Sequence, residues 1–116
     1  KTQIHFLCYL PSVVKNIKNN FPNQKATINL IPSLFNNDVN RIKQEIASSN
    51  SDGISLHIDS KESIKLVEKL KNEGLFVLTW TVNDKRFMNK LIEAKVDGII
   101  TDYPKKLAKI LRKIEE

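Results

Sequence analysis

Short apolar runs alternate with amphipathic segments along the whole chain. Five of the runs are rich in β-branched or aromatic residues and are predicted as β-strands, at residues 4–10, 26–31, 54–58, 75–82 and 98–101. After the runs, apolar residues recur three or four positions apart, as Ile64, Val67 and Leu70 do, and this spacing is typical of a helix with one buried face. The pattern therefore predicts five consecutive βα units, which repeat as structural units and not as a sequence motif.

Residues that favour helix starts stand between these segments. Pro11-Ser12 predicts the start of the first helix. Asp59 is followed three positions later by a glutamate, a spacing that predicts a capping box for the third helix. Asn83 and Asp102 are predicted to cap the fourth and fifth helices.

Two α/β architectures fit this order of elements, and both have parallel strands joined by helical crossovers. One is the C-terminal part of a TIM-type (β/α)8 barrel, because a complete barrel needs about 250 residues and this chain has 116. The alternative is a free-standing, doubly wound sheet that closes its own core at this length. No linker or low-complexity segment divides the chain, so residues 1–116 are predicted to form a single partial domain.

The net positive charge of the chain is compatible with a nucleic-acid partner, but the types of residue that carry the charge argue against one. The net charge is +6, yet lysine outnumbers arginine sixteen to three and no aromatic residues interleave with the basic ones, so no nucleic-acid partner is predicted. The densest basic group lies in the last helix, opposite its apolar residues, and is predicted to be a plain solvated face. Its members are Lys105, Lys106, Lys109, Arg112 and Lys113.

Other features restrict the class of protein further. No apolar run reaches the roughly 20 residues of a membrane helix, so no membrane segment is predicted in this chain. The single cysteine, Cys8, lies in an apolar run and is predicted to be a small buried hydrophobe and not a reactive thiol. The chain starts at Lys1 and not at a methionine, and this start is compatible with a processed product or with a piece of a longer protein. The cellular compartment stays undetermined.

Candidate chemistry is expected at the carboxyl ends of the strands, where parallel α/β folds bind ligands. His57 and Asp59 are two positions apart, so they share a strand face and could form a metal-binding or acid–base pair, with a structural role as the alternative for each. Trp80 lies near a strand end beside polar residues, which favours a pocket wall, with burial in the core as the alternative. Glycine-rich phosphate loops, cysteine clusters and serine nucleophile motifs are absent from the sequence.

Two segments near the C-terminus resemble the signature of glycerophosphodiester phosphodiesterases. They are Trp80-Thr81-Val82-Asn83 and, beginning fifteen residues after Asn83, Gly98-Ile99-Ile100-Thr101-Asp102-Tyr103-Pro104. The resemblance covers residues 54–116 well and residues 1–50 weakly. In the weaker part, Cys8-Tyr9-Leu10-Pro11 stands where the family carries a Ser-Phe-Asp-Pro type segment, and keeps only its proline and an aromatic residue.

The resemblance implies a metal-dependent phosphodiesterase on a TIM-type barrel, which uses Mg²⁺ or Ca²⁺ to cleave glycerophosphodiesters to glycerol 3-phosphate and an alcohol. The family's catalytic histidines, arginine and metal-binding carboxylates belong to His-Arg-Gly, Glu-x-Asp and His-Asp segments of the first strands, and none of these occurs here. By resemblance the chain supplies pocket wall, with Trp80 as the first candidate and Tyr9 as the next, and His57 is the third predicted substrate-binding residue. It supplies no catalytic residue and no metal ligand, and no metal is expected to bind to this chain alone.

Cleavage of a phosphodiester needs a cation or arginine and a proton donor, so this chain alone is expected to be inactive. The expected substrate of the complete enzyme is a small glycerophosphodiester whose head group is undetermined. A partial barrel exposes strand edges and apolar faces, so association with a second copy or with the missing barrel half is predicted. The alternative is a non-catalytic binding or regulatory half-barrel module. A receiver-like domain is disfavoured because no acidic cluster follows the first strand.

Overall fold

The structure is a computed structural model that describes residues 5–8, 15, 18–20, 23 and 25–115. The helix predicted to begin at Pro11 falls mainly outside these residues, although Lys15 and residues 18–20 are helical. Tyr9, one of the predicted pocket residues, also lies outside the described residues.

Five parallel strands form one sheet, and their spatial order follows their order in the chain. They are β1 (His5–Cys8), β2 (Lys25–Leu30), β3 (Gly53–His57), β4 (Val77–Trp80) and β5 (Gly98–Ile99). Ser55 in the middle of β3 pairs with Asn29 of β2 on one side and with Leu78 of β4 on the other. All five predicted strands are therefore present, but β4 and β5 are shorter than predicted.

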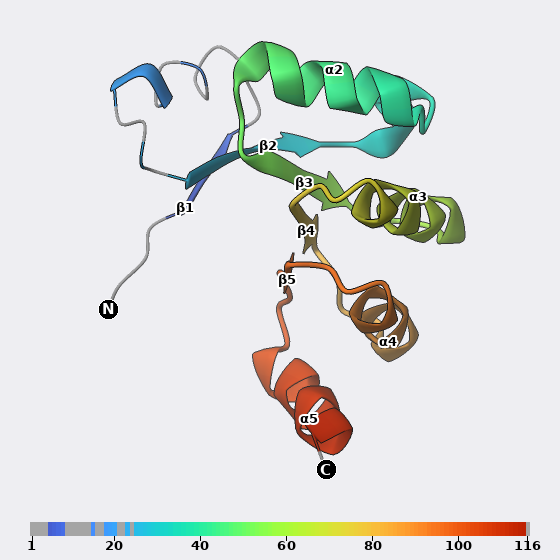
Figure 1. The fold of residues 1–116 in the computed structure, drawn as a ribbon. Helices are drawn as coiled ribbons and strands as arrows, with labels where there is room; N and C mark the ends of the chain where they lie inside the picture. The colour runs from blue at the N-terminus through green and yellow to red at the C-terminus, as the bar shows by residue number, and fades with distance from the viewer. Residues whose placement is uncertain (1–4, 9–14, 16–17, 21–22, 24, 116) are drawn as a thin grey trace.

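The α-helices labelled in Figure 1 lie on one side of the sheet. They are α2 (Val39–Ser49), α3 (Lys61–Asn72), α4 (Lys85–Glu93) and α5 (Pro104–Glu115), and a short 3-10 helix, η1 (Pro32–Phe35), precedes α2. Each crossover moves one strand in the same direction, so right-handed connections place these helices on the same face. A doubly wound sheet reverses its strand order and carries helices on both faces. That alternative is therefore wrong, and the sheet has the winding of a barrel.

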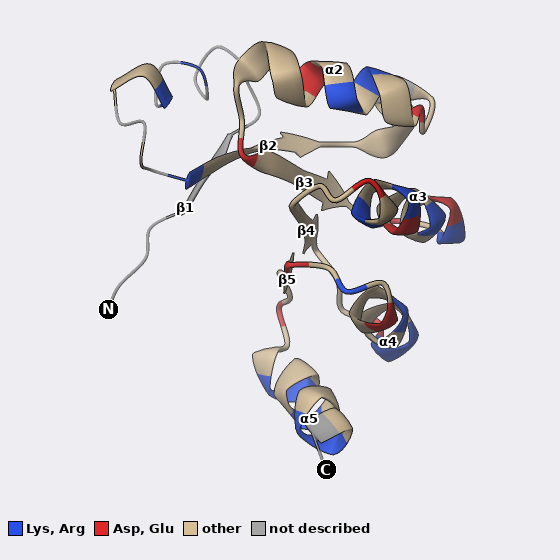
Figure 2. Ribbon diagram, in the orientation of Figure 1, with Lys and Arg blue, Asp and Glu red and all other residues tan. Residues whose placement is uncertain are grey.

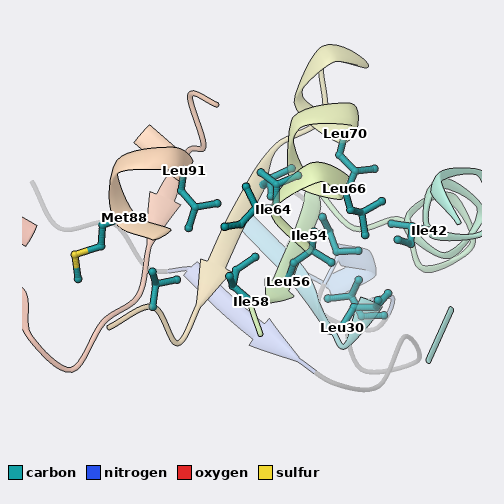
Figure 3. Close-up of a cluster of buried hydrophobic side chains, with 14 of the residues drawn as sticks. Leu30, Ile42, Ile54, Leu56, Ile58, Ile64, Leu66, Leu70, Met88 and Leu91 are labelled. Carbon is teal, nitrogen blue, oxygen red and sulfur yellow. The ribbon is translucent and has the colours of Figure 1, made fainter. Parts of the chain in front are cut away.

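The hydrophobic core lies between the sheet and these helices (Figure 3). Ile54 and Leu56 of β3 point toward the helices and are completely buried, as are Leu70 of α3 and Leu91 of α4. The residues that alternate with them on the strands face away from the helices.

In the part of the chain that the structure describes, no helix has both the length and the apolar character needed to span a bilayer.

The observed helix caps differ from the predicted ones by one residue at α3 and α4. Ser60 Oγ accepts a hydrogen bond from the Ser63 N–H at 3.3 Å, and Ser63 Oγ accepts one from the Ser60 N–H at 3.2 Å. The capping box predicted at Asp59 is therefore wrong, because the reciprocal pair that satisfies both free N–H groups lies one position later. Likewise α4 is capped by Asp84 and not by Asn83.

An aspartate directly before β3 and another directly before β5, each in an Asp-Gly-Ile segment, bind the preceding strand through both the side chain and the backbone. The Asp52 carboxylate accepts the Ala26 N–H at 2.7 Å, and the Asp52 N–H donates to the Ala26 carbonyl at 2.8 Å. Asp97 makes the same two contacts with Val77, at 2.7 Å and 2.9 Å. A lysine ammonium completes each arrangement, at 3.0 Å from Asp52 and 2.7 Å from Asp97. The Asp-Gly-Ile segment therefore recurs at the start of two of the five strands and makes the same contacts each time.

Candidate functional site

The carboxyl ends of β3, β4 and β5 form one continuous edge of the sheet. Backbone pairing continues past the strands, because the Ile58 N–H donates to the Trp80 carbonyl at 2.8 Å and the Val82 N–H donates to the Ile100 carbonyl at 2.9 Å. The loops that leave these strands are therefore held in sheet register. This is the edge at which parallel α/β folds bind ligands, and it is called the carboxyl edge below.

His57 and Trp80 form an aromatic pair at the carboxyl edge. They are register partners in β3 and β4, and their ring centroids lie 4.8 Å apart with the ring planes tilted by 48°. His57 Nδ1 lies 3.7 Å from Asp59 Oδ2, which is too long for a hydrogen bond. The predicted proximity of His57 and Asp59 is therefore confirmed, whereas the contact between His57 and Trp80 was not predicted.

The Trp80 indole is held by a hydrogen bond to the neighbouring strand. Its Nε1–H donates to the Ser55 carbonyl at 3.0 Å. The residue is half-buried, so it is neither fully enclosed in the core nor fully exposed. Because the indole has a single N–H donor and Ser55 accepts it, a ligand can meet only the face and edge of the ring.

Asn83 links the loops that follow β4 and β5. Its Oδ1 accepts hydrogen bonds from the Thr101 hydroxyl and the Asp102 N–H, each at 3.0 Å, and its Nδ2 donates to Asp102 Oδ2 at 3.0 Å. Asp102 was predicted to cap α5, but its carboxylate binds Asn83 and α5 begins at Pro104. The signal that could have revealed this contact is that both residues follow neighbouring strands at the same edge.

Lys106 joins this network to α5. Its ammonium donates to the Asn83 carbonyl at 3.0 Å and lies 4.9 Å from the centroid of the Tyr103 ring. A cation over an aromatic face contributes about 0.5–1 kcal/mol at exposed sites. The rim of the carboxyl edge therefore holds a cation that is positioned by a carbonyl group and a ring, and not by an acid.

Polar atoms without partners lie on the sheet face opposite the helices. Asn29 Oδ1, Ser55 Oγ and His57 Nδ1 are buried, and within the described part of the chain they have no hydrogen-bond partner. Asn29 and Ser55 are register partners, and Ser55 alternates with His57 along β3, so all three share one face. Buried polar groups are normally paired, so these three atoms are exceptions within the described part of the chain.

Asp84 is the acidic residue of the β4–α4 loop whose ionisation is perturbed. The Arg86 N–H donates to its carboxylate at 2.7 Å and, as the largest cause, lowers the pKa of this group below its ordinary value. The Arg86 guanidinium, 3.6 Å away, acts in the same direction. Asp84 is therefore an anion at neutral pH and is unsuited to donate a proton as a general acid.

The residues that the structure describes do not fit a divalent cation. Among them, no three His, Cys, Asp or Glu side chains converge closely enough to hold a metal ion. His57 and Asp59 supply two donors, and Asp102 is engaged with Asn83. His57 and Asp59, the predicted metal-binding or acid–base pair, therefore have no third metal donor beside them among the described residues.

The structure places two of the three predicted pocket residues side by side. Trp80 and His57 are in contact at the carboxyl edge, whereas Tyr9 lies outside the described residues. Their role in binding a substrate stays a prediction. Sequence reasoning missed Ser55 as the group that orients Trp80, because a backbone carbonyl carries no residue-specific signal in the sequence.

Comparison with known proteins places the chain in a family. Residues 4–106 match the Glycerophosphoryl diester phosphodiesterase family. Over 49 residues the chain is 47% identical to a glycerophosphodiester phosphodiesterase of Caldanaerobacter subterraneus subsp. tengcongensis, and the match covers 42% of this chain and 20% of that protein. Over 39 residues it is 41% identical to the putative glycerophosphodiester phosphodiesterase YhdW of Bacillus subtilis, covering 34% of this chain and 16% of that protein.

Solved structures share the fold at low sequence identity. A glycerophosphodiester phosphodiesterase from Parabacteroides distasonis superposes with a TM-score of 0.73 and 22% identity, over 97% of this chain and 44% of that one. An Oleispira antarctica phosphodiesterase, solved with the product sn-glycerol-3-phosphate, gives a TM-score of 0.74 and 20% identity, over 97% and 43% of the two chains.

These coverages show that the chain corresponds to only part of each relative. The chain spans less than half of the two solved chains, and its matched segments span a fifth or less of the two curated relatives. The predicted fold is therefore confirmed, because the five parallel strands and the described helices form part of a TIM-type barrel. Since the family match runs through all five strands and into the first turn of α5, the chain belongs to the glycerophosphoryl diester phosphodiesterase family.

Proposed function

We propose that residues 1–116 form the last five βα units of an enzyme that hydrolyses glycerophosphodiesters to glycerol 3-phosphate and an alcohol. The observation that carries the proposal is the family match over residues 4–106. The structural relative from Oleispira antarctica, solved with sn-glycerol-3-phosphate, supports a small phosphorylated polyol as the product. In this proposal the chain contributes the pocket wall at the carboxyl edge.

Trp80 and His57 form the described part of that wall. The bond from the Trp80 N–H to Ser55 holds the indole in one orientation and leaves its ring to cover the carbon chain of a glycerol group. His57 lies against this ring and adds an imidazole beside the apolar face of the indole, with its Nδ1 atom buried. Pockets for small ligands commonly combine apolar walls with a few placed polar groups. Tyr9 is the third wall residue of the proposal.

The catalytic groups belong, in this proposal, to the part of the barrel outside this chain. A barrel of this type has eight strands and the sheet has five, so three βα units remain. These units supply the general acid and base and the ligands of the divalent metal, Mg²⁺ or Ca²⁺. When bound, such a metal stabilises negative charge on the phosphoryl oxygens. The described residues lack a comparable donor set, so the isolated chain is inactive in this proposal.

The same three units close the barrel around the sheet face opposite the helices. They add groups to the same sheet face on which the buried polar atoms of Asn29, Ser55 and His57 have no partner among the described residues. A second copy of this chain brings five more strands, too many for an eight-stranded barrel. Of the two associations predicted from the sequence, the strand count therefore favours the missing barrel part over a homodimer.

A non-catalytic binding module is the second candidate function. In this candidate the two converging donors of the described carboxyl edge, His57 and Asp59, are not completed to a metal site by any other part of the protein. Such a module binds a glycerophosphodiester at the wall formed by Trp80 without turning it over. The two candidates therefore differ in turnover, and not in ligand class.

A chimera tests the pocket role of Trp80. It joins residues 1–116 to the N-terminal part of the Caldanaerobacter relative, in place of the matching C-terminal part. With glycerophosphocholine and Mg²⁺ or Ca²⁺, Trp80→Leu is expected to lower kcat/KM about tenfold or more, as the loss of one apolar pocket contact does. The matched control is Phe76→Leu, just before β4 at the opposite end of the strand, which should change kcat/KM by less than about twofold.

The outcomes of this experiment separate the two candidate functions. A Trp80→Leu chimera with unchanged kcat/KM contradicts the pocket role. A folded chimera that binds glycerophosphocholine without hydrolysing it favours the non-catalytic module.

A further inference from the structure

A groove between α4 and α5 is lined by lysines from both helices. It has a volume of about 230 Å³, and its lining residues are Lys85, Lys106, Lys109, Lys113 and the buried Ile110. Lys85 comes from α4 and the other three lysines come from α5, whose basic face is visible in Figure 2. The fold thus adds a cation from a neighbouring helix to the basic face that the sequence predicted to be merely solvated. This feature is called the lysine groove below.

The charges of the lysine groove are not neutralised by acids within the described part of the chain. Elsewhere in that part lysines do pair with acids, as Lys18 does with Asp52 at 3.0 Å and Lys71 does with Asp97 at 2.7 Å. No described acid lies within ion-pair distance of a lysine of the groove. The groove therefore presents a positive field to a partner.

The arrangement of three of these lysines is unfavourable for α5, which carries them. Lys109 and Lys113 are four residues apart on α5, a spacing at which like charges repel. Lys106 lies in the first turn of α5, where the helix dipole disfavours cations and no acidic residue occupies the turn, whereas the anionic Asp84 caps α4 beside Lys85. An anionic partner relieves both effects.

We propose that the lysine groove docks the protein on an anionic phospholipid surface. Groups of about four to eight cations on an amphipathic helix bind acidic lipids, and lysine acts as a flexible point charge on head-group phosphates. Tyr103 lies beside Lys106 and is 54% exposed, and tyrosine is enriched where proteins meet the membrane interface. Arginine forks and base-stacking aromatics, which nucleic-acid surfaces favour, are absent from the lining of the groove.

Docking through this groove is compatible with the candidate site. Because Lys85 and Lys106 stand at the starts of the helices that follow β4 and β5, the groove begins at the carboxyl edge. It lies on the side of α5 away from Leu107 and Leu111, so completion of the barrel core leaves it open. The proposal rests on charge and placement, and it does not depend on the proposed hydrolysis.

Vesicle co-sedimentation of the 116-residue chain tests the proposal. The chain is expected to bind vesicles of phosphatidylcholine mixed with phosphatidylglycerol but not vesicles of phosphatidylcholine alone, and added salt should weaken the binding. The variant Lys85→Gln, Lys109→Gln, Lys113→Gln should lower the partition coefficient roughly 100-fold, because each lysine near an anionic surface contributes about a factor of five. Circular dichroism establishes that the variant is folded.

A second triple variant separates a specific surface from overall net charge. Lys65→Gln, Lys69→Gln, Lys90→Gln removes the same charge from exposed positions of α3 and α4, and should lower the partition coefficient by less than about fivefold. Equal losses in the two folded variants overturn the proposal, as does failure of the unaltered chain to bind the anionic vesicles. Tighter binding to an RNA oligonucleotide than to the vesicles, lost in the groove variant, also overturns it.

Discussion

The Trp80 indole donates its N–H to the Ser55 carbonyl at 3.0 Å. The bond joins a side chain at the end of β4 to the backbone in the middle of β3. The ring is therefore oriented by the scaffold before any ligand arrives, which is the preorganisation that binding sites require. Trp80 is therefore neither purely a core residue nor fully exposed, because it is anchored to the neighbouring strand and is half-buried at the edge.

Trp80→Phe isolates the energetic effect of this bond. The variant keeps an aromatic ring but removes the N–H donor, so the Ser55 carbonyl loses a partner and the smaller ring fills less space. We expect the free energy of unfolding to fall by about 1–3 kcal/mol. Urea unfolding followed by circular dichroism measures it, and an unchanged unfolding midpoint contradicts a stabilising role for the bond.

Asn83→Ala tests whether one side chain holds two loops together. The variant removes the acceptor for the Asp102 N–H and the Thr101 hydroxyl, together with the donor to the Asp102 carboxylate. We expect amide hydrogen exchange to become faster at Asp102, while amides of the β3 core keep their protection. Asn72→Ala, at the exposed end of α3, is the matched control and should leave exchange at Asp102 unaltered.

Asp52 makes stability depend on pH. Burial raises the pKa of this group, but the hydrogen bond from the Ala26 N–H and the Lys18 ammonium outweigh burial and hold the pKa below its ordinary value of 3.8. The stabilisation is therefore fully present above about pH 5 and is lost as the pH falls through the folded-state pKa. Asp52→Asn should lower the free energy of unfolding by about 1–2 kcal/mol at neutral pH, with a smaller difference in acid.

Urea unfolding at neutral and acidic pH measures this difference. Glu68→Gln, on the exposed surface of α3, serves as the control and should change stability by less than about 0.5 kcal/mol. A difference between the unaltered protein and the Asp52→Asn variant that does not shrink toward low pH argues against the proposed linkage.

Ser60→Ala tests the corrected start of α3. The substitution removes the cap of the Ser63 N–H, so we expect a loss of about 1 kcal/mol in the free energy of unfolding. Asp59→Ala removes the residue that the sequence favoured as the cap and should cost less than about 0.5 kcal/mol. A larger loss for Asp59→Ala than for Ser60→Ala reverses the assignment of the cap.

The order of the elements and the parallel pairing of the strands could be predicted, because both follow from the periodicity of apolar residues along the chain. Apolar runs such as residues 54–58 must be buried, and parallel strands need helical crossovers, so the succession of βα units follows. Cap positions could not be fixed in the same way. Asp59 and Ser60 are adjacent, and both residue types are favoured as helix caps. Only the position of the Ser63 hydroxyl, which accepts the Ser60 N–H, decides between them.

The candidate site was predictable only in its residue types. Strand periodicity placed His57 and Asp59 on one face, whereas the contact between His57 and Trp80 depends on the register between β3 and β4. The lysine groove also required the fold, because Lys85 lies more than twenty positions before Lys109 in the chain and meets it through helix packing. Long-range register and packing carry no local signal in a single sequence.

The most direct test of the account measures release of glycerol 3-phosphate from glycerophosphocholine in the presence of Mg²⁺ or Ca²⁺. The assay compares residues 1–116 alone with the folded chimera that carries the N-terminal part of the Caldanaerobacter relative. We predict turnover by the chimera and none by the 116-residue chain. Turnover by the isolated chain at the rate of the chimera would contradict the claim that this part of the barrel supplies the pocket wall and not the catalytic groups.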